Sequence, residues 1–234
     1  MTQGVSVVTF DGDETLWNFQ SAMRKALGIA AQRFAAEGLS RRDGSPVTAD
    51  WLGDVRENVA RLPNFSNARM EDIRWAAFQE VSREVGADEE FTASVFKEFM
   101  DARHSSVTAY DDTAACLVTL KQLGFRLGLV TNGNSRPSVL GLDGAFEVIV
   151  VAADCGFRKP DPRIYHHAAE RFGVEPSACA HVGDHVEEDV EAAAAAGMRS
   201  VWIDRAESHT KTMAWRTISR LEQLPALLGT ELAS

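Results

Sequence analysis

The sequence predicts an α/β protein whose doubly wound parallel sheet is interrupted after its first strand by an inserted all-helical domain. Two textures of the chain carry this prediction. Short β-branched runs alternate with helical segments at the start of the chain and beyond residue 108, whereas the stretch between them has helical periodicity alone. Strands that alternate with helices are typical of a parallel sheet with right-handed crossovers. We therefore expect a core domain of residues 1–16 and 109–234 and a helical domain of residues 17–108.

Five runs are expected to form the strands of the sheet. Each is rich in β-branched or other apolar residues, and each is bounded by Gly, Pro or Asp. The runs are residues 5–10, 126–130, 147–151, 178–182 and 199–203. Their nearly continuous apolar character suits strands that are covered on both faces.

Three helices are expected between these strands, at residues 113–123, 162–172 and 187–196. Asp161 is the expected N-cap of the second helix, with a proline at its first position, and Gly173 its expected end. The segment of residues 134–146 has room for only a turn or two of helix. We expect a reduced crossover there, which would leave part of the sheet less covered or open to self-association.

The stretch of residues 17–108 is predicted to contain about four helices. Phe19, Met23, Leu27, Ala31 and Phe34 recur on one helical face, and two later segments repeat this pattern. Glycine- and proline-containing breaks separate the segments. We interpret the aromatic residues of this region as packing for a small helical domain, in preference to a cofactor site.

Composition excludes several classes of partner. The formal net charge is -10 at pH 7, whereas nonspecific binding to nucleic acid or anionic membranes needs clustered Lys and Arg. The chain has no apolar run near the roughly 20 residues that cross a bilayer, and no basic leader precedes its first strand-like run. Its three widely spaced cysteines suit reduced thiols. We expect a cytoplasmic monomer or homodimer with no nucleic-acid or membrane partner.

Polar side chains follow the expected strands at the points where the strands end. They are Asp11, Asp13 and Thr15 after the first strand, Thr131, Asn132 and Gly133 after the second, Lys159 after the third, and Asp184 and Asp189 after the fourth. Ligands of open parallel sheets bind beyond the carboxyl ends of the strands, so these side chains should converge. Ordinary loop preferences would explain any one of them, but explain poorly four such groups in succession.

Carboxylates that crowd together repel one another unless a cation lies among them. Oxygen ligands with room for water suit Mg²⁺ better than zinc. A divalent ion, a lysine and hydroxyl or amide donors around one carboxylate form a site suited to phosphoryl transfer. Of Asp11 and Asp13, one would act as an ionised nucleophile, and the other would be protonated when it meets the leaving oxygen.

Four stretches of the chain together resemble the four motifs of the haloacid dehalogenase-like hydrolase superfamily. They are FDGDETLW, LVTNG, RKPDPRIY and HVGDHVEEDVEAAAAAGM, in the family's order. A lone D-x-D-x-T would be weak evidence, but the joint match is specific. The resemblance implies a Rossmann-like core, and the helical insert lies where the helical-cap subfamily of phosphatases carries its lid.

The resemblance also implies catalytic roles. Asp11 matches the nucleophile that becomes a phospho-aspartate, and Asp13 matches the acid–base that protonates the leaving alcohol and then activates water. Thr131 matches the hydroxyl that binds phosphoryl oxygens. Lys159 matches the lysine that neutralises the nucleophile and the transferring group.

Metal and substrate contacts follow from the same match. A Mg²⁺ ion would be held by Asp11, Asp184 and the main-chain carbonyl of Asp13, with Asp189 and Thr15 supporting that shell. The candidate substrate contacts are Asn132, Gly133, Trp17 and Asn18, and for Asn132 support of the loop is an equally good interpretation.

These matches predict a Mg²⁺-dependent phosphatase acting on a small phosphorylated metabolite. Three alternatives stay open. The true dehalogenases of the family lack an acid at the position of Asp13, so the aspartate found here favours ester cleavage. Sugar-phosphate mutases share the same motifs. A non-catalytic phospho-aspartate signalling or binding protein is the alternative from another class, although a receiver domain is shorter and has no such insert.

Overall fold

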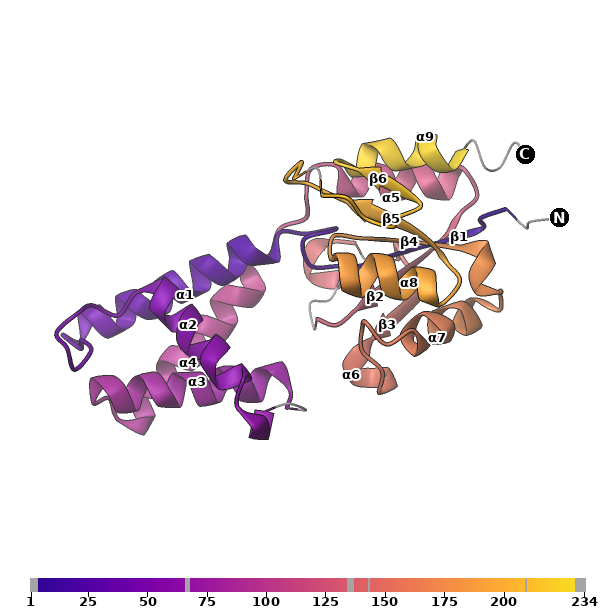
Figure 1. The fold of residues 1–234 in the computed structure, drawn as a ribbon. Coiled ribbons are helices and arrows are strands. Elements are labelled where there is room, and N and C mark those ends of the chain that lie inside the picture. The colour runs from indigo at the N-terminus through magenta and orange to yellow at the C-terminus, as the bar shows by residue number, and fades with distance from the viewer. Residues whose placement is uncertain (1–3, 66–67, 134–136, 143, 209, 230–234) are drawn as a thin grey trace. The chain divides into compact units, whose positions relative to one another are not determined.

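The computed structural model describes residues 4–65, 68–133, 137–142, 144–208 and 210–229. The chain divides into two compact units (Figure 1). One unit comprises residues 1–19 and 108–234 and holds the sheet, and the other comprises residues 20–107 and is helical.

The described part of the first unit contains a six-stranded parallel sheet with the order β3-β2-β1-β4-β5-β6 (Figure 1). The strands are β1 (Val7–Phe10), β2 (Arg126–Thr131), β3 (Val148–Val151), β4 (Cys179–Gly183), β5 (Arg199–Ile203) and β6 (Arg216–Ile218). This confirms the doubly wound α/β class and the five expected strands. Because β1 is paired with β2 on one side and β4 on the other, the residues after these three strands lie at neighbouring positions on one edge.

Strand β6 was not predicted, for a physical reason. It has three residues at the edge of the sheet, and only Ile218 among them is buried. An edge strand that faces solvent on one side needs no continuous apolar run, so it gives little periodic signal.

The helices of this unit follow its strands along the chain and pack against the sheet (Figure 1). They are α5 (Thr113–Gln122), α6 (Ala152–Cys155), α7 (Arg163–Phe172), α8 (Ala192–Ala195) and α9 (Leu224–Gly229). The Asp161 carboxylate accepts a hydrogen bond from the main-chain nitrogen of Arg163 at 2.9 Å, as an N-cap does, and Gly173 ends α7 with φ of 68°. Between β2 and β3, the described residues form only the short 3₁₀ helix Pro137–Leu140, and residues 134–136 and 143 lie outside the description.

The third expected helix is divided into two parts. Residues Val186–Glu191 form a π-helical segment that leads into the four-residue α8. The nitrogen of Ala192 donates to the oxygen of Glu187 across the wider, five-residue spacing of this segment. At its start, the nitrogen of Asp189 donates to the oxygen of His185 at 2.8 Å, and the nitrogen of His185 donates to the Asp189 carboxylate at 3.0 Å. The turn thereby directs the Asp189 side chain back toward the end of β4. Sequence periodicity alone does not reveal such a local widening.

The second unit contains α1 (Phe19–Ala36), α2 (Ala49–Ala60), α3 (Met70–Val85) and α4 (Glu89–Ser105). Two of its helices begin at capping side chains, since Thr48 accepts from the nitrogen of Trp51 and Asp88 accepts from that of Phe91. Its aromatic residues pack inside the unit, with the rings of Phe78 and Phe99 5.0 Å apart. None of the helices in the described ranges is both long and apolar enough to span a membrane.

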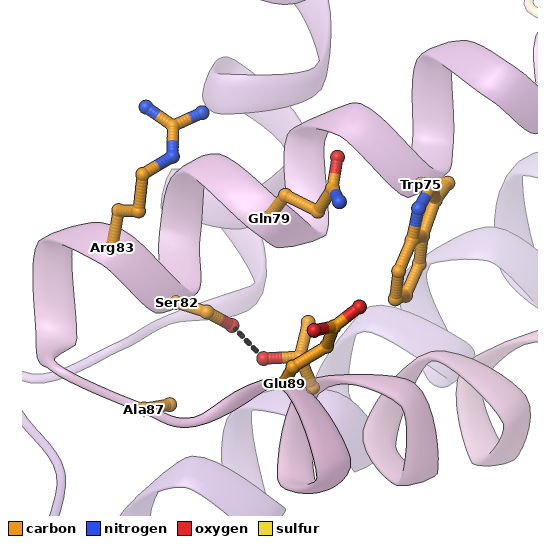
Figure 2. A pocket seen from close by; sticks show the side chains of 7 residues that line it. Trp75, Gln79, Ser82, Arg83, Ala87 and Glu89 are labelled. Carbon is orange, nitrogen blue, oxygen red and sulfur yellow. Dashed lines mark hydrogen bonds between the residues drawn. The ribbon is translucent and has the colours of Figure 1, made fainter.

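A cavity of about 340 Å³ opens between α3 and α4 of the helical unit (Figure 2). Trp75, Gln79 and Arg83 line it from α3, and its two buried hydroxyls belong to Ser82 and Thr92. These hydroxyls lie 2.6 Å apart and bind each other. The cavity wall therefore satisfies its own buried polar groups, and we assign no chemistry to it.

Candidate active site

Side chains from four loops meet beyond the carboxyl ends of the central strands. Asp11 follows β1, Thr131 ends β2, and Asp184 follows β4. Carboxylate oxygens of Asp11, Asp184 and Asp189 all lie within 4.8 Å of one another. The strand order explains this convergence, because β2, β1 and β4 are adjacent and parallel.

Lys159 lies between two of these carboxylates. Its Nζ is 2.5 Å from Oδ1 of Asp11 and 2.6 Å from Oδ1 of Asp189, and the side chain is 1% exposed. Burial by itself would lower the pKa of Lys159, but the charges of Asp11 and Asp189 outweigh burial and raise it well above the ordinary value. The lysine therefore remains a protonated cation next to Asp11.

The carboxylates carry more negative charge than one lysine can balance. Burial raises the pKa of Asp11 well above its ordinary value, and the charges of Asp189 and Asp184 add to this effect while Lys159 opposes it. Burial and the charge of Asp189 raise the pKa of Asp184 to about 6. The three carboxylates could hold a metal ion, and their hard oxygen donors are those that Mg²⁺ prefers.

Asp189 is held from several sides by the protein itself. Its Oδ1 accepts from Lys159 and lies 3.3 Å from Nε2 of His181, and its Oδ2 accepts from the nitrogen of His185. Burial opposes ionisation of Asp189, but Lys159 and His181 outweigh it and lower its pKa. Gly183 is required beside it, because a Cβ at that position would collide with the Asp189 carboxyl group. These contacts make Asp189 a support for Lys159.

His181 is a buried part of this site that the sequence interpretation did not identify. It is fully buried on β4, with Nδ1 2.9 Å from the hydroxyl of Thr9 on β1. Burial lowers the pKa of His181, so the neutral ring can donate from Nε2 to Asp189. The available signal was a polar residue inside an otherwise apolar run, at residues 178–182.

Thr131 and Gly133 form a tight turn at the end of β2. Thr131 is 2% exposed, and its hydroxyl accepts from the nitrogen of Gly133 at 2.9 Å. A Cβ at Gly133 would come within 2.7 Å of Oδ2 of Asp13. The turn after β2 therefore packs directly against the loop after β1, and only glycine fits without displacing Asp13.

Asn132 supports the lysine loop. Its side-chain amide binds the main-chain nitrogen and oxygen of Lys159, and its Nδ2 also donates to the Glu188 carboxylate, each at 2.9 Å. These contacts agree with the loop-support interpretation of Asn132, which the sequence left open beside substrate contact. Glu188 was not anticipated, since nothing in its sequence neighbourhood marks a partner 56 residues away.

Trp17 differs from its expected position at a substrate surface. The side chain has no exposed area, and its indole nitrogen donates to Oδ1 of Asp13 at 2.6 Å. Asn18 is half-buried, and its main-chain nitrogen donates to the oxygen of Thr108, where the chain re-enters the first unit. Trp17 therefore lies next to Asp13, a predicted catalytic group. Asn18 joins the segment after β1 to the segment that begins at Thr108.

Thr15 lies beside Asp184, one of the carboxylates expected to hold the ion. It is fully buried, and its hydroxyl lies 3.3 Å from Oδ1 of Asp184. Arg205 donates to the oxygen of Thr15 at 2.7 Å and binds both carboxylate oxygens of Asp112 at 3.1 Å. The Arg205–Asp112 pair was missed, because its two members are separated by 93 residues.

Several known proteins are similar to this chain over most of its length. A family model described as haloacid dehalogenase-like hydrolase matches residues 5–197. The chain is 28% identical over 208 residues to glyceraldehyde 3-phosphate phosphatase of Methanopyrus kandleri, with 86% of this chain and 84% of the relative covered. It is 30% identical over 236 residues to N-acylneuraminate-9-phosphatase of Mus musculus, with 96% and 94% covered.

A solved structure extends the similarity to the fold as a whole. The crystal structure of a 2-haloacid dehalogenase from Pseudomonas syringae pv. Tomato matches with a TM-score of 0.77 and 29% sequence identity. The match covers 97% of this chain and 99% of that one. The similarity therefore includes the insert as well as the sheet.

Proposed function

Because this chain belongs to the haloacid dehalogenase-like hydrolases, we propose that it is a Mg²⁺-dependent phosphatase that cleaves a small phosphorylated metabolite through a phospho-aspartate. The observation that carries the proposal is the position of Asp11, which has the Lys159 ammonium 2.5 Å away and Asp184 in the same carboxylate cluster. A carboxylate nucleophile beside a fixed cation suits attack on an anionic phosphoryl group.

The residues present fit a Mg²⁺ ion. The carboxylates of Asp11 and Asp184 would hold it, together with the main-chain carbonyl of Asp13, whereas Asp189 is already bound by Lys159 and His185. The raised pKa of Asp184, about 6, reflects a charge that the protein alone leaves poorly compensated. When bound, the ion supplies positive charge beside the transferring phosphoryl group.

In the first half of the reaction, a carboxylate oxygen of Asp11 attacks phosphorus. The bond from phosphorus to the ester oxygen breaks, and its electron pair stays on that oxygen, which takes a proton from Asp13. Lys159 remains protonated throughout and balances the negative charge on the phosphoryl oxygens. Thr131 and the main chain around it bind these oxygens. The products of this half are an alcohol and the phospho-aspartate at Asp11.

In the second half, water releases the phosphate. The Asp13 carboxylate takes a proton from a water molecule as the water oxygen bonds to phosphorus. The bond between phosphorus and the Asp11 oxygen then breaks, which restores the Asp11 carboxylate and frees inorganic phosphate. Asp13 is again protonated and ready for the next substrate.

Several observations support a small phosphate monoester as the substrate. Two similar proteins are named as phosphatases of glyceraldehyde 3-phosphate and of N-acylneuraminate 9-phosphate. We propose that the helical unit acts as a cap, with boundaries near residues 17 and 108, that closes over the substrate and excludes bulk water. The acidic net charge of -10 makes nucleic acid an unsuitable substrate.

Dehalogenation is the second candidate, because a similar solved structure is described as a 2-haloacid dehalogenase. Loss of halide needs no proton donor. Here Asp13 is present and is held by an indole hydrogen bond of 2.6 Å, which favours a reaction in which an oxygen must be protonated. A sugar-phosphate mutase would use the same groups, and product analysis distinguishes it.

One assay separates these functions. Purified protein is incubated with Mg²⁺ and para-nitrophenyl phosphate, then with a panel of phosphorylated sugars, nucleotides and small acids, and in parallel with 2-chloropropionate. We expect release of inorganic phosphate that a chelator abolishes and added Mg²⁺ restores, and no release of chloride. Chloride release without phosphate release would overturn the proposal, as would phosphatase activity that is indifferent to the chelator.

A further inference from the structure

We infer that Trp17 is a positioning residue that orients the carboxyl group of Asp13 for proton transfer; this rests on the proposed phosphatase function. The indole nitrogen of Trp17 lies 2.6 Å from Oδ1 of Asp13, and the indole side chain has no exposed surface. Trp17 lies four positions after Asp13 in the same loop, so this contact forms within the loop after β1.

The argument begins with the chemistry of the donor. An indole N–H can only donate a hydrogen bond, so the oxygen that faces it must be an acceptor in both protonation states of the acid. Oδ1 of Asp13 is that oxygen. The indole therefore fixes the rotation of the Asp13 carboxyl group.

The position of Oδ2 is fixed by the turn after β2. A Cβ built at Gly133 would lie 2.7 Å from Oδ2 of Asp13 and 3.3 Å from the hydroxyl of Thr131. Oδ2 is thus on the side of the carboxyl group that faces the Thr131 turn, where the proposed function puts the phosphoryl oxygens. The indole and the turn after β2 thus each lie against one oxygen of the Asp13 carboxyl group and fix its orientation.

The indole itself has little freedom to move. Its ring packs on Gly12, where a Cβ would collide with the ring. The main-chain nitrogen of Trp17 donates to Gly12 at 3.2 Å, and the main-chain oxygen of Trp17 accepts from the nitrogen of Glu14 at 2.8 Å. Glu14 has φ of 63°, an uncommon conformation for a residue with a side chain. The loop after β1 therefore closes on itself and keeps the ring beneath Asp13.

The test exploits the fact that a general acid matters most when the leaving group is poor. Phenyl phosphate has a poorer leaving group than para-nitrophenyl phosphate, and kcat/KM reports only the steps up to formation of the phospho-aspartate. In Trp17→Phe, we expect kcat/KM for phenyl phosphate to fall about tenfold, a fraction of what a general acid contributes, and that for para-nitrophenyl phosphate about twofold or less. Equal losses on the two esters would overturn the inference.

Two further variants keep the result interpretable. Trp202→Phe is the matched control, because it removes another buried indole donor, 2.8 Å from the Asp184 main-chain oxygen, without touching Asp13. It should affect both esters equally, and a leaving-group dependence like that of Trp17→Phe would contradict the inference. Gly133→Ala should crowd Oδ2 and reproduce the selective loss. It therefore tests the same geometry even if Trp17→Phe fails to fold.

Asp13→Asn separates failure of this inference from failure of the proposed function. It should show the largest selective loss on phenyl phosphate. If Asp13→Asn shows that selectivity but Trp17→Phe and Gly133→Ala do not, the role of Trp17 is wrong and the phosphatase proposal stands. If Asp13→Asn leaves both esters unaffected, or the native protein hydrolyses neither, the proposed function fails.

Discussion

The side chain of Asn132 binds the main chain of Lys159 at two points. Its Oδ1 accepts from the Lys159 nitrogen at 2.9 Å, and its Nδ2 donates to the Lys159 oxygen at 2.9 Å. The loop that carries the lysine is thereby attached to the end of β2. Because the ammonium of Lys159 must balance two carboxylates from other loops, a small displacement of its main chain would disturb the entire charge arrangement.

Replacement of Asn132 tests this attachment. In Asn132→Ala, both bonds to Lys159 are lost, and we expect kcat for para-nitrophenyl phosphate to fall about tenfold or more, which corresponds to about 1.4 kcal/mol, with a smaller change in KM. Glu188→Ala is the matched control, because it removes only the third partner of the Asn132 amide. An equal loss in Glu188→Ala would show that Glu188, and not Lys159, is the partner that matters.

Removal of the lysine should affect stability as well as activity. Lys159→Met leaves Asp11 and Asp189 buried without their cation, so we expect loss of activity and a destabilisation of about 3–5 kcal/mol in urea unfolding of the metal-free protein. Lys97→Met is the control, since Lys97 forms an exposed pair with Asp101 and its side chain is 78% exposed. It should change the free energy of unfolding by less than about 1 kcal/mol. Similar effects of the two variants would contradict the geometry of the buried cluster.

The nucleophile is tested by Asp11→Asn, which keeps the size of the side chain. An amide does not attack phosphorus, so we expect kcat for para-nitrophenyl phosphate to fall by at least about a thousandfold. Circular dichroism should show that the variant remains folded. Undiminished turnover in a folded Asp11→Asn protein would remove Asp11 from the reaction.

The convergence of site residues could be predicted because strand ends have a strong sequence signal. Asp11, Thr131 and Asp184 come at the ends of apolar runs, and parallel strands bring such ends to one edge of the sheet. The order of the strands itself was not readable, and β6 was missed because an edge strand of three residues needs no apolar run.

The partners of individual side chains were less predictable than their neighbourhood. Trp17 was expected at a substrate surface, but in the structure its indole is buried and binds Asp13. For Asn132, substrate contact and loop support were both open, and its bonds to the Lys159 main chain agree with loop support. Such pairings depend on which way a side chain points once its loop is folded, and residue spacing carries little information about that. His181 stayed hidden because its partners come from three different segments of the chain.

Metal binding should stabilise the protein more at neutral than at acidic pH. Burial and Asp189 raise the pKa of Asp184 to about 6, above its ordinary value of 3.8. Without metal, the stability that Asp184 contributes is therefore fully present at acidic pH, below its pKa in the unfolded chain. This contribution is lost as the pH rises through about 6. Mg²⁺ binds the ionised form, so the ion restores this stability above about pH 6 and must compete with a proton below it. At a free concentration of about 100 times its dissociation constant, Mg²⁺ should add about 2.7 kcal/mol.

Thermal unfolding measures this linkage directly. For a chain of this size, we expect Mg²⁺ to raise Tm by about 5–10 °C near pH 8 and by much less near pH 5. Asp184→Asn removes the titrating ligand, so its Tm should respond weakly to Mg²⁺ at both pH values. Sodium chloride at matched ionic strength separates specific binding from screening, because screening depends on ionic strength alone. A Mg²⁺ shift of the same size at both pH values would show that Asp184 is not a ligand whose protonation opposes the metal.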